Sequence, residues 1–222
     1  MKKKAIILGA TGLTGSHLLE LLLQDPSYDT IKVFTRKKLG IIHSKIEEHV
    51  IDLLKLNDYA AQFTADVVFC CIGTTKAKTP NKELYRAIDY AIPVQAAKLS
   101  KQNSINSFIA ISALGANPQS NIFYNRTKGE MERDILAQEI ENTQLLQPSL
   151  IVGNRDEKRT GEDLSKQFMK LFGFLIPPRY KMVEAESVAQ TMLYLADNPA
   201  KGAIVPSEKI EKIARKARIR SI

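Results

Sequence analysis

The sequence predicts an α/β fold, a doubly wound parallel sheet with helices on both faces. Short apolar runs alternate with longer segments of helical periodicity, which is typical of βαβ units. The run VVFCCI at 67–72 shows no apolar–polar alternation, as expected of a strand covered on both faces. A turn with three glycines follows the first run, and a sheet of this kind binds its ligand at the carboxyl ends of its strands.

The expected strands lie at 3–9, 31–35, 48–52, 67–72, 107–112 and 143–147. The expected helices lie at 14–24, 57–63, 82–102, 121–140, 163–173, 186–197 and 207–217. Pro93 falls inside 82–102, where it should kink the helix or mark a local start. The whole chain, 1–222, is expected to form one domain, and 154–182 is interpreted as a small substrate-covering insertion.

The basic tail, residues 201–222, departs from the composition of the rest of the chain. It holds seven Lys and Arg against two Glu, and so carries +5 of the net charge of +8. Ile210, Ile213, Ala214 and Ala217 recur at helical spacing. We therefore expect a packed amphipathic helix with a solvated basic face, and nucleic acid is not an expected partner.

The composition is that of an ordinary soluble globular protein, with 44% hydrophobic and 25% charged residues. No apolar stretch approaches the length of a transmembrane helix, and glycines interrupt the signal-like start MKKKAIILGA. Cys70 and Cys71 are adjacent, which makes a poor structural disulfide and indicates a reducing compartment. These observations together predict a cytoplasmic protein.

The stretch GATGLTG places Gly9, Gly12 and Gly15 at the first strand-to-helix turn. Such a turn lets the backbone approach a pyrophosphate, while the following helix offers its N-terminal N–H groups. Thr11 and Thr14 can add hydroxyl donors or cap the helix, and Leu13 lies between them as part of the same candidate contact surface. The alternative is a tight turn without a ligand.

The end of the second strand distinguishes the two nicotinamide dinucleotides. NAD-binding proteins place an Asp or Glu there for the ribose 2′-hydroxyl, whereas this sequence has Arg36 and Lys37. A guanidinium can bind a 2′-phosphate in bidentate fashion, and the lysine adds charge. The sequence therefore favours NADP(H) over NAD(H), the alternative being a solvated basic loop.

Two further strand ends supply candidate cofactor contacts. Asp52, followed by Leu53, is a candidate for the adenine edge, although an Asp that only caps the next turn is an equal alternative. The fourth expected strand ends in four residues that should pass beside the ribose and diphosphate: Cys71, Ile72, Gly73 and Thr74. The cysteines are interpreted as strand residues rather than nucleophiles.

Tyr124 and Lys128 are the catalytic candidates, because i, i+4 spacing puts both on one face of a helix. Tyr28 and Lys32 have the same spacing but lie at the amino end of a strand, away from the expected site. Ser112 ends the preceding strand and can hydrogen-bond a substrate oxygen. A carbonyl that accepts hydride needs a proton, and a cation beside tyrosine brings the phenol pKa nearer the working pH.

These motifs resemble the atypical, extended side of the short-chain dehydrogenase/reductase superfamily. The resemblance rests on GATGLTG, on SALGA with Ser112, on YNRTK with Tyr124 and Lys128, and on QPSLIVGNR. More closely, FCCIGTT, SNIFYNRTKGEME and an Arg-Gly-Glu pattern within 159–162 resemble the Tat-interacting-protein-like branch of NADP-binding oxidoreductases.

The resemblance implies a Rossmann fold, an NADPH cofactor and a Ser-Tyr-Lys site. It also implies that residues 148–151 line the nicotinamide pocket, with Pro148, Leu150 and Ile151 as contacts. Ser149 stands where many relatives carry glycine. Members of this branch are linked to protein partners, so a protein partner is a second expectation beside a small carbonyl substrate.

Two classes of function remain open at this stage. One is an NADP(H)-dependent reductase of a small carbonyl compound, and the other is an NADP-bound regulatory or interaction module with little turnover. A sugar-nucleotide epimerase is disfavoured, because its substrate domain is usually larger than the segment after the last core strand. No metal site is expected, because the three histidines lack metal-ligand spacing. The oligomeric state is not encoded in any of these patterns.

Overall fold

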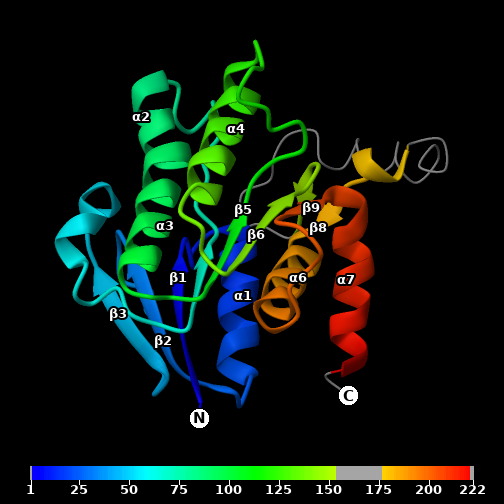
Figure 1. The fold of residues 1–222 in the computed structure, drawn as a ribbon. Helices are drawn as coiled ribbons and strands as arrows, with labels where there is room; N and C mark the ends of the chain where they lie inside the picture. Colours follow the sequence, from blue (N-terminus) through cyan, green and yellow to red (C-terminus); the bar gives the residue numbers. More distant parts are fainter. Residues whose placement is uncertain (1, 154–176, 221–222) are drawn as a thin grey trace.

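The computed structural model describes residues 2–153 and 177–220, and its centre is a parallel sheet (Figure 1). In the described residues the sheet has seven strands in the order β3-β2-β1-β4-β5-β6-β9. Their bounds are β1 Lys3–Leu8, β2 Tyr28–Thr35, β3 Ile46–Val50, β4 Val67–Cys70, β5 Ser107–Ile111, β6 Asn142–Gln147 and β9 Ile204–Pro206. Every neighbouring pair is parallel, which confirms the predicted sheet.

Helices cover both faces of the sheet (Figure 1). One face carries α2 Lys82–Arg86, the π-helical turn η2 Ala87–Ala91, α3 Ile92–Gln102 and α4 Phe123–Leu136. The other carries α1 Leu13–Gln24, α6 Ala185–Asp197 and α7 Ser207–Arg220. Short 3-10 helices lie at η1 Leu53–Tyr59 and η3 Pro178–Tyr180, and a two-stranded parallel sheet joins β7 Ile151–Val152 to β8 Val183–Glu184.

The side chains of β1 show why the strands are continuously apolar. Ile6 and Leu8 belong to the core beneath α3 and α4, whereas Ala5 and Ile7 belong to the core beneath α1 and α6. Successive strand residues point to opposite faces, so a sheet covered on both sides needs apolar residues at every position. The doubly wound architecture follows from this burial.

The structure refines the predicted helices in two places. The expected helix 82–102 is divided into α2, η2 and α3, and Pro93 lies in the first turn of α3, so the expected local start is confirmed. The expected helix 57–63 is replaced by η1, which starts earlier, at Leu53. The predicted helix 163–173 and most of the predicted insertion 154–182 lie outside the described residues.

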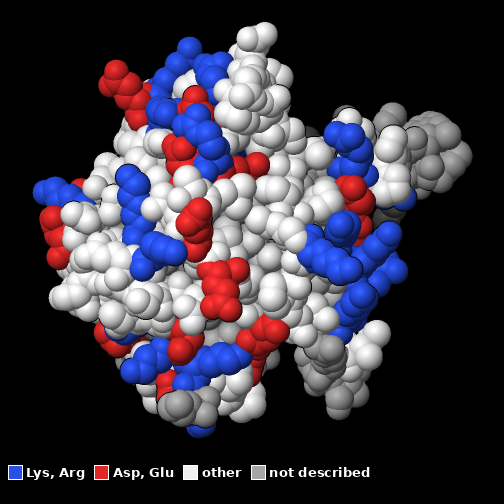
Figure 2. Space-filling view, in the orientation of Figure 1, with Lys and Arg blue, Asp and Glu red and all other residues white. Residues whose placement is uncertain are grey.

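Residues 204–220 of the basic tail form β9 and α7, and α7 packs against the rest of the domain. Ile210 and Ala214 have no exposed surface and face α6. The opposite side of α7 carries exposed Lys and Arg, which Figure 2 shows as a blue band along this helix. The predicted amphipathic helix is therefore confirmed. No helix of the described residues has the length and apolarity needed to cross a membrane.

Replacing Ile210 by Ala should lower the free energy of unfolding by about 3 kcal/mol, because a fully buried side chain leaves a cavity behind it. Urea unfolding of the purified variant measures the loss. Ile219, which is 74% exposed on the same helix, is the matched control, and its replacement by Ala should change the free energy by about 0.5 kcal/mol or less. Equal losses in the two variants would contradict the packing of α7 on the core.

Candidate functional site

The candidate site lies at the carboxyl ends of β1 and β4, where the strand order reverses direction. The chain leaves β1 toward β2 on one side and leaves β4 toward β5 on the other, and open α/β sheets bind their ligands at such a reversal of strand order. The N–H of Cys71 donates to the carbonyl of Leu8 at 2.8 Å and holds the two ends together.

The glycine turn follows β1 and lies close to the backbone of Cys71 at the end of β4. Gly9 has a φ of +87°, and a Cβ there would lie 2.9 Å from the carbonyl oxygen of Cys71. A Cβ on Gly15 would lie 2.1 Å from the carbonyl oxygen of Gly9, which is closer than any real contact. The turn therefore needs glycine at both positions, one for its conformation and one for the approach of α1.

The first turn of α1 has the properties of an anion site. Its N-cap is Gly12, no side chain caps the helix, and the first turn contains no acidic residue. The N–H groups of this turn and the positive end of the helix dipole are thus available to a phosphate. Thr11 is exposed beside them, whereas Thr14 is buried. Leu13 contacts the segment after β7, since a Cβ on Gly153 would lie 3.1 Å from its Cδ1.

The predicted nucleotide contacts on neighbouring strands fall at the same edge of the sheet. Arg36 and Lys37 follow β2 directly, and both side chains are exposed. Asp52 caps η1, with its carboxylate accepting from the N–H of Leu54 at 3.0 Å, which is the capping alternative. Leu53 is buried beneath it. A contact of Asp52 with adenine stays a prediction.

The segment after β4 contributes the remaining predicted contacts. Cys71 and Ile72 are half-buried, Gly73 is exposed and Thr74 is half-buried. Burial raises the pKa of the Cys70 thiol to about 11 and also raises the pKa of Cys71. Both thiols are therefore protonated near neutral pH, as expected of strand residues that are not nucleophiles.

The three predicted catalytic residues lie on two elements: Ser112 directly follows β5, and Tyr124 and Lys128 lie on α4. Tyr124 and Lys128 share one face of α4, with Tyr124 40% exposed and Lys128 only 3% exposed. The N–H of Ser112 donates to the carbonyl of Leu146 at 2.7 Å, which fixes its backbone beside β6. The Ser112 hydroxyl is buried and makes no well-formed hydrogen bond within the described residues.

Asp89 completes the site and was not found from the sequence. One carboxylate oxygen, Oδ1, lies 3.1 Å from the ammonium nitrogen of Lys128, and both side chains are almost fully buried. Burial alone would lower the pKa of Lys128, but Asp89 and then Tyr124 raise it overall. No spacing rule links Asp89 on η2 to a lysine on α4, because only the tertiary fold brings them together.

The pKa of Tyr124 is raised, contrary to the expectation that Lys128 brings it nearer the working pH. Burial raises the pKa of Tyr124, Lys128 acts in the opposite direction, and Asp89 adds to the rise. The structure thus balances a cation against a carboxylate beside the same phenol. The protonated form is the one that can donate a proton to an oxygen.

Glu132 is a second buried carboxyl that the sequence analysis missed. It lies one turn beyond Lys128 on α4 and accepts from the Gln147 amide nitrogen at 2.9 and 3.0 Å. Burial raises the pKa of Glu132, while the Ser112 hydroxyl, Gln147 and Lys128 oppose the rise. Its i, i+4 position relative to Lys128 was a readable signal that the two side chains share one face of the helix.

The predicted nicotinamide wall lies next to Ser112. The N–H of Leu114 donates to the carbonyl of Pro148 at 2.9 Å, so the segment after β5 is bound to the segment after β6. Pro148 is buried, Leu150 is half-exposed, and Ile151 is paired in β7. These residues stand at the edge of the sheet where a nicotinamide is expected.

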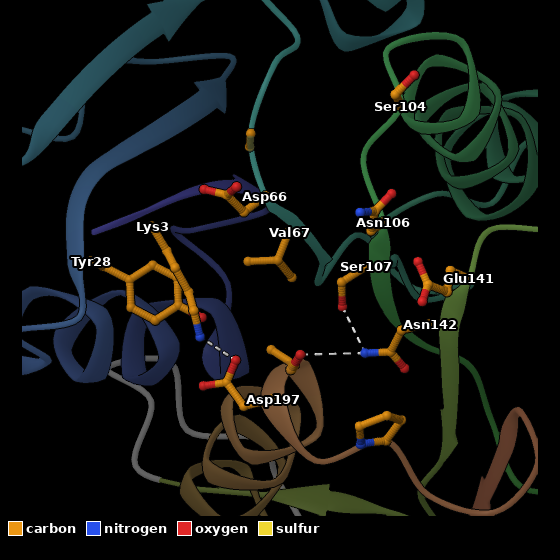
Figure 3. Close-up of a pocket in the computed structure, with 13 residues that line it drawn as sticks. Lys3, Tyr28, Asp66, Val67, Ser104, Asn106, Ser107, Glu141, Asn142 and Asp197 are labelled. Carbon is orange, nitrogen blue, oxygen red and sulfur yellow. Dashed lines mark hydrogen bonds and ion pairs between the residues drawn. The ribbon is translucent and has the colours of Figure 1, made fainter. Parts of the chain in front are cut away.

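A hollow of about 350 Å³ lies at the opposite end of the sheet (Figure 3). Its lining comes from the amino ends of the strands, including Lys3, Tyr28, Val67, Ser107 and Asn142. Tyr28 begins β2 there, so the second Tyr-x-x-x-Lys pair is remote from the catalytic trio, as its strand position predicted. This hollow is therefore not the candidate active site.

Comparison with known proteins agrees with this geometry. Residues 9–199 match the family model described as NAD(P)H-binding. Protein HTATIP2 of Rattus norvegicus is 31% identical over 170 residues, covering 75% of this chain and 70% of that protein. Protein FMP52 of Debaryomyces hansenii, named as mitochondrial, is 29% identical over 203 residues, covering 88% of each chain.

Solved structures show the same fold at low sequence identity. A UDP-N-acetylglucosamine 4-epimerase from Methanobrevibacter ruminantium has a TM-score of 0.71 at 17% identity, covering 93% of this chain and 77% of its own. The enzyme WbmH of Bordetella bronchiseptica, solved in complex with NAD+, has a TM-score of 0.70 at 16% identity, covering 92% and 74%. At these identities the likeness supports the Rossmann-like fold alone.

The expected cytoplasmic localisation is contradicted by the relatives. The FMP52 proteins of Debaryomyces hansenii, Scheffersomyces stipitis, Candida albicans and Meyerozyma guilliermondii are all named as mitochondrial. The expectation rested on adjacent free cysteines and on the lack of a long apolar run. Neither property distinguishes the cytoplasm from the interior of an organelle.

Replacing Gly15 by Ala should lower the free energy of unfolding by about 2 kcal/mol, because the new methyl group would overlap the carbonyl oxygen of Gly9. Chemical unfolding measures the change. Gly73 is the matched control at the same edge of the sheet, since a Cβ there meets only Asp89 Oδ1 at 3.6 Å. Replacing Gly73 by Ala should cost about 0.5 kcal/mol or less, and a similar cost at both glycines would contradict the close approach.

Proposed function

This chain belongs to the NAD(P)H-binding family, and from that premise we propose that it is an NADP(H)-dependent oxidoreductase of the short-chain type. It transfers a hydride between nicotinamide and a small carbonyl-type substrate. The observation that carries this proposal is the placement of Tyr124, which is 40% exposed, on the same face of α4 as Lys128, which is buried and paired with Asp89.

The residues at the carboxyl ends of β1 and β2 fit a dinucleotide. The glycine turn is a cradle that side chains would fill, and the uncapped first turn of α1 offers N–H donors for a diphosphate. Arg36 and Lys37 stand exposed at the end of β2, where a 2′-phosphate of NADP(H) would meet them. When bound, NADPH supplies the hydride.

The trio of Ser112, Tyr124 and Lys128 manages the proton that accompanies the hydride. Ser112 offers its buried hydroxyl to the substrate oxygen and orients the carbonyl. Tyr124 donates its proton to that oxygen as the carbon is reduced. Lys128 stabilises the phenolate that remains until solvent restores the proton.

The alternative is a cofactor-bound regulatory or interaction module with little turnover. Such a protein would share the cradle and the cofactor preference, so binding alone does not separate the two functions. The proposal of an enzyme is supported by the retained trio and by the accessibility of Tyr124. The proposed partner of the chain is a small carbonyl-type substrate, and the alternative function would instead involve a protein partner.

Replacing Tyr124 by Phe should lower kcat roughly 100-fold or more, because the general acid is lost while the ring remains. The measurement is NADPH oxidation with a panel of small aldehydes and ketones. Tyr28→Phe is the matched control, since Tyr28 belongs to the remote Tyr-x-x-x-Lys pair and its hydroxyl has no partner in the described residues. Equally slow oxidation by the wild type and the Tyr124 variant, with NADPH bound, would favour the module.

Replacing Arg36 by Ala should weaken NADPH binding by about 10-fold to 100-fold, because a charge-assisted bidentate contact to the 2′-phosphate is lost. Titration of cofactor fluorescence measures the dissociation constants of NADPH and of NADH. NADH lacks this phosphate and is the internal control, with its affinity expected to stay within about twofold. A variant that still prefers NADPH to the same degree would refute the assignment of Arg36.

A further inference from the structure

Asp89 occupies a position that links two parts of the candidate site. It lies in η2, between α2 and α3, and is only 1% exposed. Its Oδ2 accepts from the N–H of Thr74 at 2.7 Å, and its Oδ1 lies 3.1 Å from the ammonium of Lys128. One carboxylate therefore contacts both the segment after β4 and the catalytic lysine.

The Thr74 side of this link is held at three points. Besides the N–H bound to Asp89, the Thr74 hydroxyl pairs with the hydroxyl of Thr79 at 2.8 Å. The Thr74 carbonyl accepts from the Tyr85 hydroxyl at 3.3 Å. These contacts fix the position of Thr74. The hydrogen bond from Thr74 in turn holds the carboxylate of Asp89 in place beside Lys128.

Lys128, on the other side of the link, has fewer polar contacts than Thr74 among the described residues. Its ammonium is buried, and in the part of the chain that the structure describes it also lies 3.9 Å from the sulfur of Met131, which is a weak acceptor. A buried ammonium without an anion favours the neutral amine. The charge of Lys128 therefore depends on the carboxylate beside it.

We propose that Asp89 is a positioning residue that keeps Lys128 charged and fixes it relative to the cofactor-contact segment 71–74. This inference rests on the proposed function of Lys128. Asp89 touches neither substrate nor reacting atoms, and acts through the lysine. Asp89 lies within the π-helical turn η2, where the helical backbone continues from α2 into α3.

Other titratable groups face Lys128 as well. Tyr124 and Glu132 approach it from α4 itself, and Cys70 approaches it from β4. Tyr124 and Cys70 are protonated near neutral pH because burial raises the pKa of each. The Glu132 carboxylate accepts from the Gln147 amide, and Asp89 is the direct ion-pair partner of Lys128 in the described residues.

The test is Asp89→Asn, which keeps the size of the side chain and an oxygen for the Thr74 N–H but removes the charge. Side-chain NMR of labelled lysines follows the titration of Lys128, assigned by comparison with Lys128→Met. We expect the titration midpoint to fall by about one pH unit or more, a tenfold or larger loss of proton affinity. An unchanged midpoint would overturn the proposal.

Glu130→Gln is the matched control. Glu130 lies on the same helix as Lys128 and forms an ion pair with Arg86, so the variant also breaks an ion pair between α4 and its neighbour. The Lys128 midpoint should stay where it is in the wild type. A fall equal to that of the Asp89 variant would contradict a specific role for Asp89.

A folding defect in Asp89→Asn leads to a second measurement, the double variant Asp89→Asn with Lys128→Met. Loss of one partner of a buried ion pair leaves the other uncompensated, whereas loss of both removes that penalty. The double variant should therefore have a higher Tm than Asp89→Asn. A double variant that is no more stable would refute the pairing.

The pH dependence of the carbonyl-reduction rate separates this inference from the proposed function. In the Asp89 variant, the rate should fall as the pH rises through the lowered midpoint, because the lysine becomes neutral, while the wild-type rate stays level. If neither protein reduces any carbonyl, the proposed function fails. The NMR titration still decides whether Asp89 controls the charge of Lys128.

Discussion

The approach of two backbone segments at the carboxyl ends of β1 and β4 determines how the rest of the site is arranged. Gly9 contacts the carbonyl of Cys71, and α1 begins so close to Gly9 that position 15 has no room for a Cβ. This contact brings the uncapped end of α1 over the point where the sheet changes its winding direction. The glycine turn and the basic end of β2 lie at this same edge of the sheet.

Charge is organised around one buried cation. Lys128 forms a buried ion pair with Asp89, and it shares a face of α4 with Tyr124 and Glu132. Asp89 and Tyr124 raise the pKa of Lys128, and Lys128 opposes the rise in the pKa of Tyr124 and of Glu132. Removal of charges from water is costly, and the hydrogen bonds from Thr74 and Gln147 help to offset that cost. A site of this kind keeps a defined protonation state because its charges are paired inside the protein.

Local patterns were sufficient for the parallel sheet, for the glycine turn and for the placement of Tyr124 and Lys128 on one helix, because each depends on residues close in sequence. Apolar runs encode doubly covered strands, and i, i+4 spacing encodes a shared helix face. Asp89 was not predictable in this way, since its partner lies on a different helix. Strand β9 was missed because three residues ending in Pro206 are too few for a periodic signal. The predicted cytoplasmic localisation was wrong, because neither the cysteine pattern nor the absence of a long apolar run encodes the compartment.

The position of Pro206 has a consequence for how copies of this chain can meet. β9 is an edge strand of the seven-stranded sheet, and proline has no N–H with which to continue a ladder. The opposite edge, β3, carries the charged Glu47 and Glu48. Exposed strand edges are where sheets of separate molecules join, and proline and charge both oppose that pairing. Growth of this sheet by strand addition is therefore disfavoured at each end, which directs any self-association to the helical faces.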